Sequence, residues 1–390
     1  MSRRGASAAL LLLLCFAACR HAAAPPSLSP DLAAQLAATP GAHLSGAARG
    51  LTPLAVLDRK DYHYALAWAP GSQAVAFSHL GLRAFQLALW RVGEKAPRSD
   101  RSLGAQDFDV EGLAYAPDGR SVAAVSREGR VHLLEVDSVR ELARAQLEEP
   151  LVSVAFHPQG RFLVVGGARG GLAVLSVPAL AVLSTLQGHG DEVRALAFAP
   201  DGTLYSGGWD RHLKIWEARE LLLGLLLQPR ADYVQEAFVN DLSLDAKGER
   251  LALALSAQKA ERTPEVYQRE RAGVREPPSE HNAALLLEAR SGRVLQRWSE
   301  HAGVVATVGL SPDGRSVASG GWDKQLLLFT QGEARPCAQE RFGLGVRRVR
   351  FSPDGQLLAV AAWTPQNMAQ ESDPAAVLYR VAYAAPALAQ

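Results

Sequence analysis

Apolar residues occur along this chain in short runs, each broken by a tight polar turn and followed by a second apolar run. The segment that begins at residue 195 reads ALAFAPDGTLYSGG, and the segment that begins at residue 307 reads TVGLSPDGRSVASGG. A Pro-Asp-Gly turn between two apolar runs favours a tight antiparallel hairpin. The pattern therefore predicts pairs of short β-strands rather than helices.

The hairpin pattern recurs seven times, in copies that begin near residues 65, 112, 153, 195, 241, 307 and 347. Neighbouring copies begin about 40 to 66 residues apart, which leaves room for four short strands in each repeat. Apolar residues are nearly continuous in places, as in LAVLSVPALAVL at 172–183, and such strands are typical of sheets covered on both faces. Seven such sheets are enough to form a closed ring.

Two of the copies carry a further set of residues at matching positions. In the fourth copy these are His189, Ser206, Asp210 and Trp216, and in the sixth copy they are His301, Ser319 and Asp323, with Phe329 at the tryptophan position. In these residues the chain resembles the WD-repeat β-propeller family. The resemblance implies an all-β fold, a seven-bladed β-propeller of four-stranded antiparallel blades, in which the four residue types form a hydrogen-bonded set inside one blade.

An Asp, a His and a Ser also make up the composition of a hydrolytic triad. The same set occurs twice, however, and neither serine lies in the G-x-S-x-G turn that exposes a nucleophile. We therefore expect both sets to be structural, and we expect no catalytic residues.

The first residues, MSRRGASAALLLLLCFAACRH, combine two arginines with an apolar run that is too short to span a bilayer as a stable helix, which is typical of an export signal. The run ends at Phe16-Ala17-Ala18-Cys19, which resembles a bacterial lipobox, where the cysteine receives lipid. We expect a signal peptide at 1–18, an Ala- and Pro-rich tether at 19–50, and a lipoprotein anchored to a membrane of the cell envelope through Cys19. Ordinary secretory cleavage, giving a secreted or periplasmic protein, is the alternative.

The propeller is predicted to span 51–385, with residues 51–57 supplying the outer strand of the last blade and so closing the ring. The predicted blade limits are about 58–97, 98–140, 141–180, 181–223, 224–290, 291–334 and 335–385. Cys337 is the one cysteine in the predicted propeller, so we expect no disulfide there and interpret this cysteine as a small buried residue.

Two insertions, 258–281 and 365–374, fall between the second and third strands of their blades. The turns at the same place in other copies carry Trp209, Trp322, Trp363 and Arg127. Because alternate loops of an antiparallel meander emerge on the same side, these features are predicted to share one face. Aromatic residues and arginine are typical anchors of protein contacts. We expect a protein partner on this face, with the tryptophans as anchors and the arginine at the rim; alternatively, each tryptophan covers its own turn.

The net charge and the absence of known motifs argue against several classes of protein function. The formal net charge is +1, which predicts no nucleic-acid partner, and Arg347, Arg348 and Arg350 alternate with valines as the polar side of a strand would. The sequence contains no zinc, haem, phosphate-loop or calcium motif, so we expect no metal and no cofactor. The pattern favours a non-catalytic protein-interaction scaffold. The alternative, a propeller enzyme or small-ligand sensor, would require several carboxylates or histidines to converge in the central channel.

Overall fold

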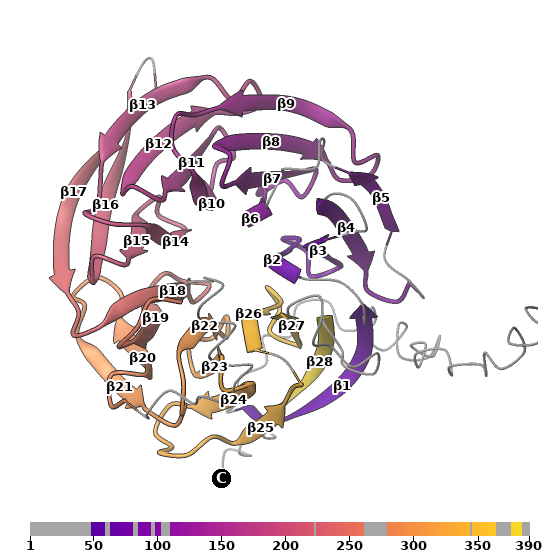
Figure 1. Ribbon diagram of the computed structural model, residues 1–390, viewed down its shortest axis with the longest axis vertical. Helices are drawn as coiled ribbons and strands as arrows, with labels where there is room; N and C mark the ends of the chain where they lie inside the picture. The colour runs from indigo at the N-terminus through magenta and orange to yellow at the C-terminus, as the bar shows by residue number, and fades with distance from the viewer. Residues whose placement is uncertain are drawn as a thin grey trace, which may run out of the picture.

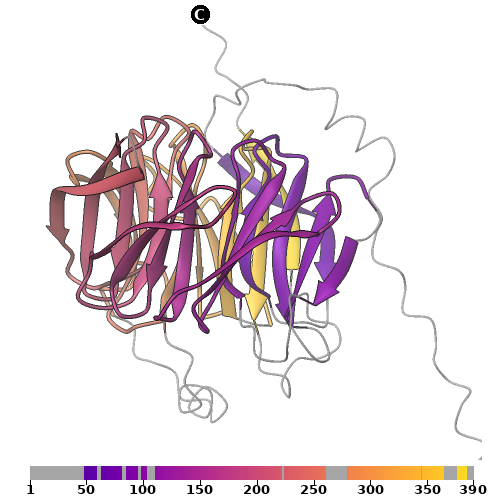
Figure 2. The ribbon, with the colours of Figure 1, turned by 90° about the horizontal axis from the view of Figure 1, so that it is seen from above.

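The computed structural model describes residues 48–58, 63–80, 85–94, 98–102, 110–221, 224–260, 279–343, 345–363 and 376–383. These residues form seven antiparallel sheets of four strands each and contain no helix. The sheets are arranged as blades around a central axis, with their first strands at the centre (Figure 1). Seen from the side, the strands run roughly along the axis of a thick disc (Figure 2). The predicted seven-bladed β-propeller is confirmed.

The strands follow the chain from blade to blade. Blade one consists of β2 (His63–Trp68), β3 (Ala74–Leu80), β4 (Phe85–Arg91) and β5 (Arg98–Ser102), and blade two of β6 (Val110–Tyr115), β7 (Ser121–Ser126), β8 (Arg130–Glu135) and β9 (Glu141–Gln146). Blade three consists of β10 (Leu151–Phe156), β11 (Phe162–Gly167), β12 (Gly171–Ser176) and β13 (Val182–Gln187), and blade four of β14 (Val193–Phe198), β15 (Leu204–Gly208), β16 (His212–Leu221) and β17 (Gly224–Val234).

The remaining three blades complete the ring. Blade five consists of β18 (Phe238–Leu244), β19 (Arg250–Ser256), β20 (Ala283–Glu288) and β21 (Val294–Trp298), and blade six of β22 (Val305–Leu310), β23 (Ser316–Gly321), β24 (Gln325–Thr330) and β25 (Ala338–Arg341). Blade seven consists of β26 (Gly345–Phe351), β27 (Leu357–Trp363), β28 (Ala376–Tyr383) and β1 (Ala48–Asp58).

The ring closes through β1, the first strand that the structure describes and the outermost strand of the last blade. It pairs antiparallel with β28, from Ala48 opposite Tyr383 to Asp58 opposite Ala376. The predicted closing strand is thereby confirmed, although it begins before residue 51 and takes in residues that the sequence pattern assigned to the tether. Pro53 is tolerated in β1 because, among the described residues, this strand is the edge strand of its sheet.

The predicted blade limits are wrong for all seven blades, and each error has the same cause. The limits at residues 140 and 180, for example, cut β9 from blade two and β13 from blade three. The sequence repeat begins with the outer strand of one blade and continues with the three inner strands of the next. Repeat and sheet are therefore offset by one strand, so that each repeat ties two neighbouring blades together.

Neighbouring blades pack face to face through buried apolar side chains. Between blades two and three, Val125 and Leu133 belong to the same cluster as Leu163 and Leu175, and all four are essentially inaccessible to solvent. The second strands β7 and β23 are buried at every position, whereas the outer strand β9 alternates between exposed and half-buried residues. The near-continuous apolar runs of the sequence thus correspond to strands covered on both faces.

The loops between second and third strands emerge on one side of the disc, which we call the insertion face because β19 and β20, and β27 and β28, are joined there by the two long segments. The opposite side carries the short turns between first and second strands and is called the turn face.

Every pairing of a first strand with a second strand contains a register shift near the start of the first strand. The residue skipped by the register is Glu111 in β6, Arg194 in β14, Asn240 in β18 and Arg347 in β26. Such β-bulges re-aim the side chains beside them. Polar residues are thereby gathered around the start of the inner strands, toward the insertion face.

Candidate functional site

Four side chains of blade four form a closed hydrogen-bonded set. Nδ1 of His189 lies 3.0 Å from both carboxylate oxygens of Asp210, and its Nε2 lies 2.6 Å from Oγ of Ser206. Nε1 of Trp216 donates to the same hydroxyl oxygen at 2.8 Å. Asp210 also accepts two backbone N–H groups. The structure thus brings together all four residues that the sequence pattern grouped.

The contacts run from Asp through His to Ser as in a hydrolytic triad, but the serine is not exposed as a nucleophile would be. Burial would raise the pKa of Asp210, yet the hydrogen bond and charge of His189 and the two backbone donors outweigh it and lower this pKa to about 2. Ser206 is wholly inaccessible to solvent and already accepts the indole N–H. Because no substrate carbonyl can reach its oxygen, the arrangement holds the blade together rather than performing acyl transfer.

Blade six repeats the set with one member replaced. Nδ1 of His301 lies 3.0 and 3.1 Å from the two oxygens of Asp323, and its Nε2 lies 2.7 Å from Oγ of Ser319. Phe329 stands where blade four has tryptophan and donates nothing; instead its ring stacks on Trp298 at 5.0 Å between centroids. The hydroxyl of the blade-six serine therefore lacks the indole donor that its blade-four counterpart has.

The prediction that Trp209 is an exposed anchor is wrong. Only 4% of this residue is exposed, and its Nε1 donates to Oδ1 of Asn240 at 2.9 Å. The Arg194 guanidinium lies 4.9 Å from the indole ring centroid, and the Lys259 ammonium lies 5.3 Å from it. The indole N–H finds its partner on the next blade, so the side chain turns inward and covers the joint between blades four and five.

The other predicted partner-binding residues lie differently. Trp322 is half-buried and packs against the cluster of Trp209, Ala260 and Val304 at the insertion face. Arg127 keeps 40% of its side chain exposed while it binds two buried carboxylates. Trp363 ends β27, but its side chain lies outside the described residues, as do Cys19 and residues 261–278 and 364–375.

A group of charged residues lies in the channel, where the sequence pattern did not place it. A cavity of about 300 Å³ is lined by residues from six inner strands, β2, β6, β10, β14, β18 and β26. Arg194, Asp241, Arg348 and Arg350 line it together with small and apolar residues. This cavity is the candidate functional site.

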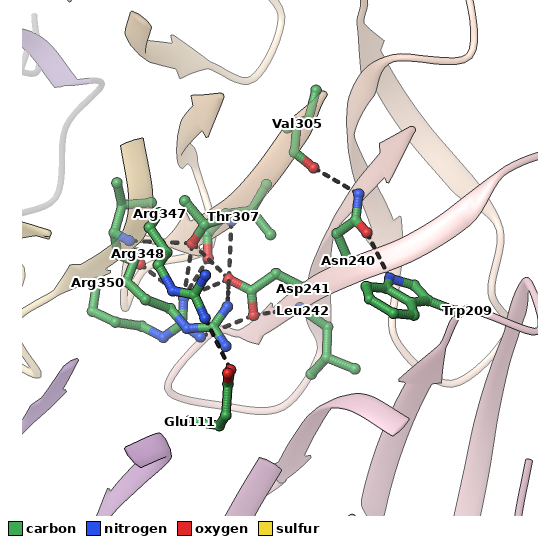
Figure 3. A network of polar contacts seen from close by, with 12 residues as sticks. Glu111, Trp209, Asn240, Asp241, Leu242, Val305, Thr307, Arg347, Arg348 and Arg350 are labelled. Atoms are coloured by element: carbon green, nitrogen blue, oxygen red, sulfur yellow. Dashed lines mark hydrogen bonds and ion pairs between the residues drawn. The ribbon is translucent and has the colours of Figure 1, made fainter. Parts of the chain in front are cut away.

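Asp241 is the centre of the channel network (Figure 3). Arg350 binds it with two parallel hydrogen bonds, 2.8 Å to Oδ2 and 2.9 Å to Oδ1. The carboxylate also accepts the hydroxyl of Thr307 at 2.6 Å and two backbone N–H groups. Burial would raise the pKa of Asp241, but the Arg350 and Arg348 charges and these hydrogen bonds hold it below its usual value. The carboxylate is thus a buried anion with a full complement of donors.

A second group of charged residues bridges the same end of the channel. Glu111 accepts from Arg127 at 3.1 Å and from Arg347 at 2.9 Å, and so connects blade two with blade seven. Glu192 accepts from Arg194 at 2.5 Å and from Arg127 at 3.2 Å. In the described network, five guanidinium groups share three carboxylates.

The sequence interpretation of Arg347, Arg348 and Arg350 as the plain polar side of a strand is wrong. The first two are buried, with 9% and 7% exposure. The register shift between Val346 and Arg348 breaks the alternation that the interpretation assumed. The available signal was the recurrence of charged residues at the start of the strands that precede each turn, and carboxylates do converge in the channel.

Other chemistry is sparse in the described part of the chain. Among its residues no cluster of three or more His, Cys, Asp or Glu is placed to hold a metal ion. Cys337 is half-buried, its thiol donates to the carbonyl of Leu328 at 3.3 Å, and burial raises its pKa. A search of the same residues for a helix of the length and apolarity needed to cross a membrane finds none.

Comparison with known proteins matches the two blades that hold the hydrogen-bonded sets. Residues 180–217 and 292–330 match the family model described as WD domain, G-beta repeat. Two segments of the chain thus match the WD repeat. These segments contain the His, Ser and Asp of each set, and one relative of similar sequence is by name a WD-repeat protein.

Three relatives illustrate the extent of the similarity. WD repeat-containing protein SL1-17 of Schistosoma mansoni is 28% identical over 35% of this chain and 44% of its own length. THO complex subunit 3 of Arabidopsis thaliana is 28% identical over 40% of this chain and 49% of its own. The guanine nucleotide-binding protein subunit beta of Oryza sativa subsp. indica is 31% identical over 33% and 37%. The chain thus spans less than half the length of these relatives.

Proposed function

We propose that this WD-repeat propeller is an exported protein-interaction scaffold that binds a protein partner on its insertion face. The observation that carries the proposal is the cluster of Trp209, Phe238, Lys259, Val304 and Trp322 on that face. It spans blades four to six and combines aromatic rings with a cation. Preformed, well-packed patches of this composition are typical of binding hot spots.

The relatives support a scaffold role. WD-repeat propellers generally act as protein-interaction scaffolds. One of the relatives is by name a subunit of the THO complex, and another is by name the beta subunit of a guanine nucleotide-binding protein. We infer that this chain, too, works by holding other proteins, with Trp322, Trp363 and Arg127 as contact residues and Trp209 as their support.

The test compares two half-buried aromatic residues on opposite faces, Trp322 on the insertion face and Phe162 beside a turn of blade three on the turn face. After a partner has been captured with the parent protein from envelope extracts, its affinity is measured for Trp322→Ala and Phe162→Ala. We expect the first variant to lose about 2 kcal/mol of binding and the second to bind like the parent. Undiminished binding by Trp322→Ala, or loss with Phe162→Ala alone, would place the partner elsewhere.

We further propose that Cys19 carries lipid and holds the propeller at a membrane of the cell envelope. The support is the apolar run ending in Ala17-Ala18-Cys19. Cys19→Ala is expected to move the protein from the membrane fraction to the soluble fraction without changing its thermal unfolding, whereas the control Cys15→Ala, within the signal, keeps it at the membrane. Mass spectrometry that finds an unmodified mature terminus contradicts the proposal.

A further inference from the structure

Arg348 is a buried cation without a hydrogen bond of its own. It is 7% exposed, and within the described residues its side chain donates no hydrogen bond; its ion pair with Asp241 spans 3.8 Å. Asp241 has no acceptor position left to offer, because it already takes five hydrogen bonds and a carboxylate has about four lone-pair sites. Burial and the neighbouring Arg350 and Arg194 lower the Arg348 pKa to about 10, although Asp241 opposes them.

Arg194 is the second incompletely satisfied cation of the channel. It is 4% exposed, and one of its terminal N–H groups binds Glu192. Its Nε has no hydrogen-bond partner among the described residues. Glu192 is shared with Arg127, which binds it with two further N–H groups. Arg194 on β14 and Arg348 on β26 lie on opposite sides of the ring and line one cavity. Both have N–H groups that lack an acceptor within the described part of the chain.

The cavity beside them has room for a ligand. Its volume is about 300 Å³, which is at the lower end of the range of small-molecule sites. Small residues of the inner strands, among them Ala65, Ala67, Gly112 and Ala155, keep the space open. Arg350, also in the lining, has 27% of its side chain exposed, so solvent enters the space. A buried guanidinium whose N–H donors lack acceptors is unfavourable by itself.

We propose that the central channel binds a small anion through a carboxylate or phosphate group, with Arg348 and Arg194 as its direct contacts. An oxyanion offers the lone pairs that the saturated Asp241 lacks, and the planar fork of arginine matches it with two parallel hydrogen bonds. Arg350, which Asp241 already holds, adds positive charge at the same place (Figure 3). The apolar remainder of the lining suits a short body attached to the charged group.

The test measures thermal unfolding and calorimetric binding with two probes, inorganic phosphate and propionate, against chloride at equal ionic strength. We expect at least one oxyanion to bind and to raise the midpoint of unfolding beyond the effect of chloride. The probe with the lower dissociation constant identifies the group as phosphate or carboxylate. If neither probe binds more tightly than chloride, the proposal is wrong.

Arg348→Met keeps most of the side chain and removes the charge. We expect it to weaken oxyanion binding at least about tenfold, the loss of a charge-assisted hydrogen bond, while unfolding without added anion occurs at the same or a higher temperature than in the parent. Arg315→Met, an exposed arginine at the turn of blade six, is the matched control and should bind like the parent. Unchanged binding by Arg348→Met contradicts the assignment.

The anion site and the partner surface can be tested independently. Normal oxyanion binding by Trp322→Ala would show that the anion site does not depend on the partner surface.

Discussion

The hydrogen-bonded set of blade four and the network of the channel both bury carboxylates near the insertion face, but they differ in how completely donors and acceptors match. In blade four, Asp210 and Ser206 receive the donors of one histidine and one tryptophan, and each of these side chains has its partner within the blade. In the channel, Asp241 is saturated while Arg348 next to it is left without a hydrogen bond. A complete set stabilises one blade, whereas an incomplete one across several blades leaves donors for a ligand.

The largest expected effect lies in the channel, at Asp241. Replacing it with alanine removes the bidentate partner of Arg350 and leaves the buried Arg348 and the half-buried Arg350 without their anion. We expect Asp241→Ala to lower the free energy of unfolding by about 3 to 5 kcal/mol, as for other broken buried pairs. Urea unfolding of the parent and the variant measures the difference.

A double variant sharpens this prediction. If Arg348 is an uncompensated charge, adding Arg348→Met to Asp241→Ala should recover part of the lost stability. A loss below about 1 kcal/mol for the single Asp241→Ala variant would contradict the buried network, because breaking such a pair costs more than breaking a surface pair.

In blade four the expected effect is smaller, because the groups left behind are hydrogen-bonding partners rather than unpaired cations. Asp210→Ala removes the acceptor of His189 and of two backbone N–H groups. We expect a loss of roughly 1 to 3 kcal/mol in urea unfolding, and a similar loss for Asp323→Ala in blade six. An Asp210→Ala variant that unfolds like the parent would show that the set contributes nothing to stability.

The two regions also differ in how far the sequence reveals them. His189 and its partners lie within a single repeat, so a recurring local spacing predicts both sets. Asp241 and Arg350 are 109 positions apart, and Glu111 and Arg347 are 236 apart. No local pattern predicts which inner strands face one another across a ring.

The exposure of Trp209 likewise depends on information that the sequence of one repeat does not hold. Its place in a turn of the insertion face was predictable, but its burial depends on Asn240 of the next blade and on Lys259, at the start of the long insertion. The closing strand was predictable because an unpaired segment and a blade with one strand missing stand at the two ends of the chain.

The stability that Asp210 of the blade-four set contributes is expected to be lost at acidic pH. The pKa of Asp210 is near 2 in the folded state and about 3.9 when unfolded. Between about pH 4 and pH 2 the unfolded chain therefore binds a proton that the folded chain does not, so stability falls as the pH falls through this window and is fully present above it.

We expect this carboxylate alone to account for about 2 kcal/mol of the stability lost over that window. The measurement is the free energy of unfolding at pH 6, 4, 3 and 2 for the parent and for Asp210→Ala. The difference between the two should shrink toward pH 2. A difference that stays constant with pH would mean that the carboxylate titrates normally in the folded protein.

The smallest expected effect concerns the one member that blades four and six do not share. Trp216→Phe removes the indole N–H that Ser206 accepts and copies the residue that blade six has at this place. We expect a loss of about 1 kcal/mol in the free energy of unfolding, the net worth of one hydrogen bond.

The reverse change in blade six, Phe329→Trp, should also destabilise the protein. The ring of Trp298 already occupies the neighbouring space, 5.0 Å away between centroids, and a larger ring would overpack it. Urea unfolding of both variants decides the point. If Phe329→Trp instead raised stability, the missing indole donor would outweigh the packing of blade six, and the two blades would be interchangeable at this position.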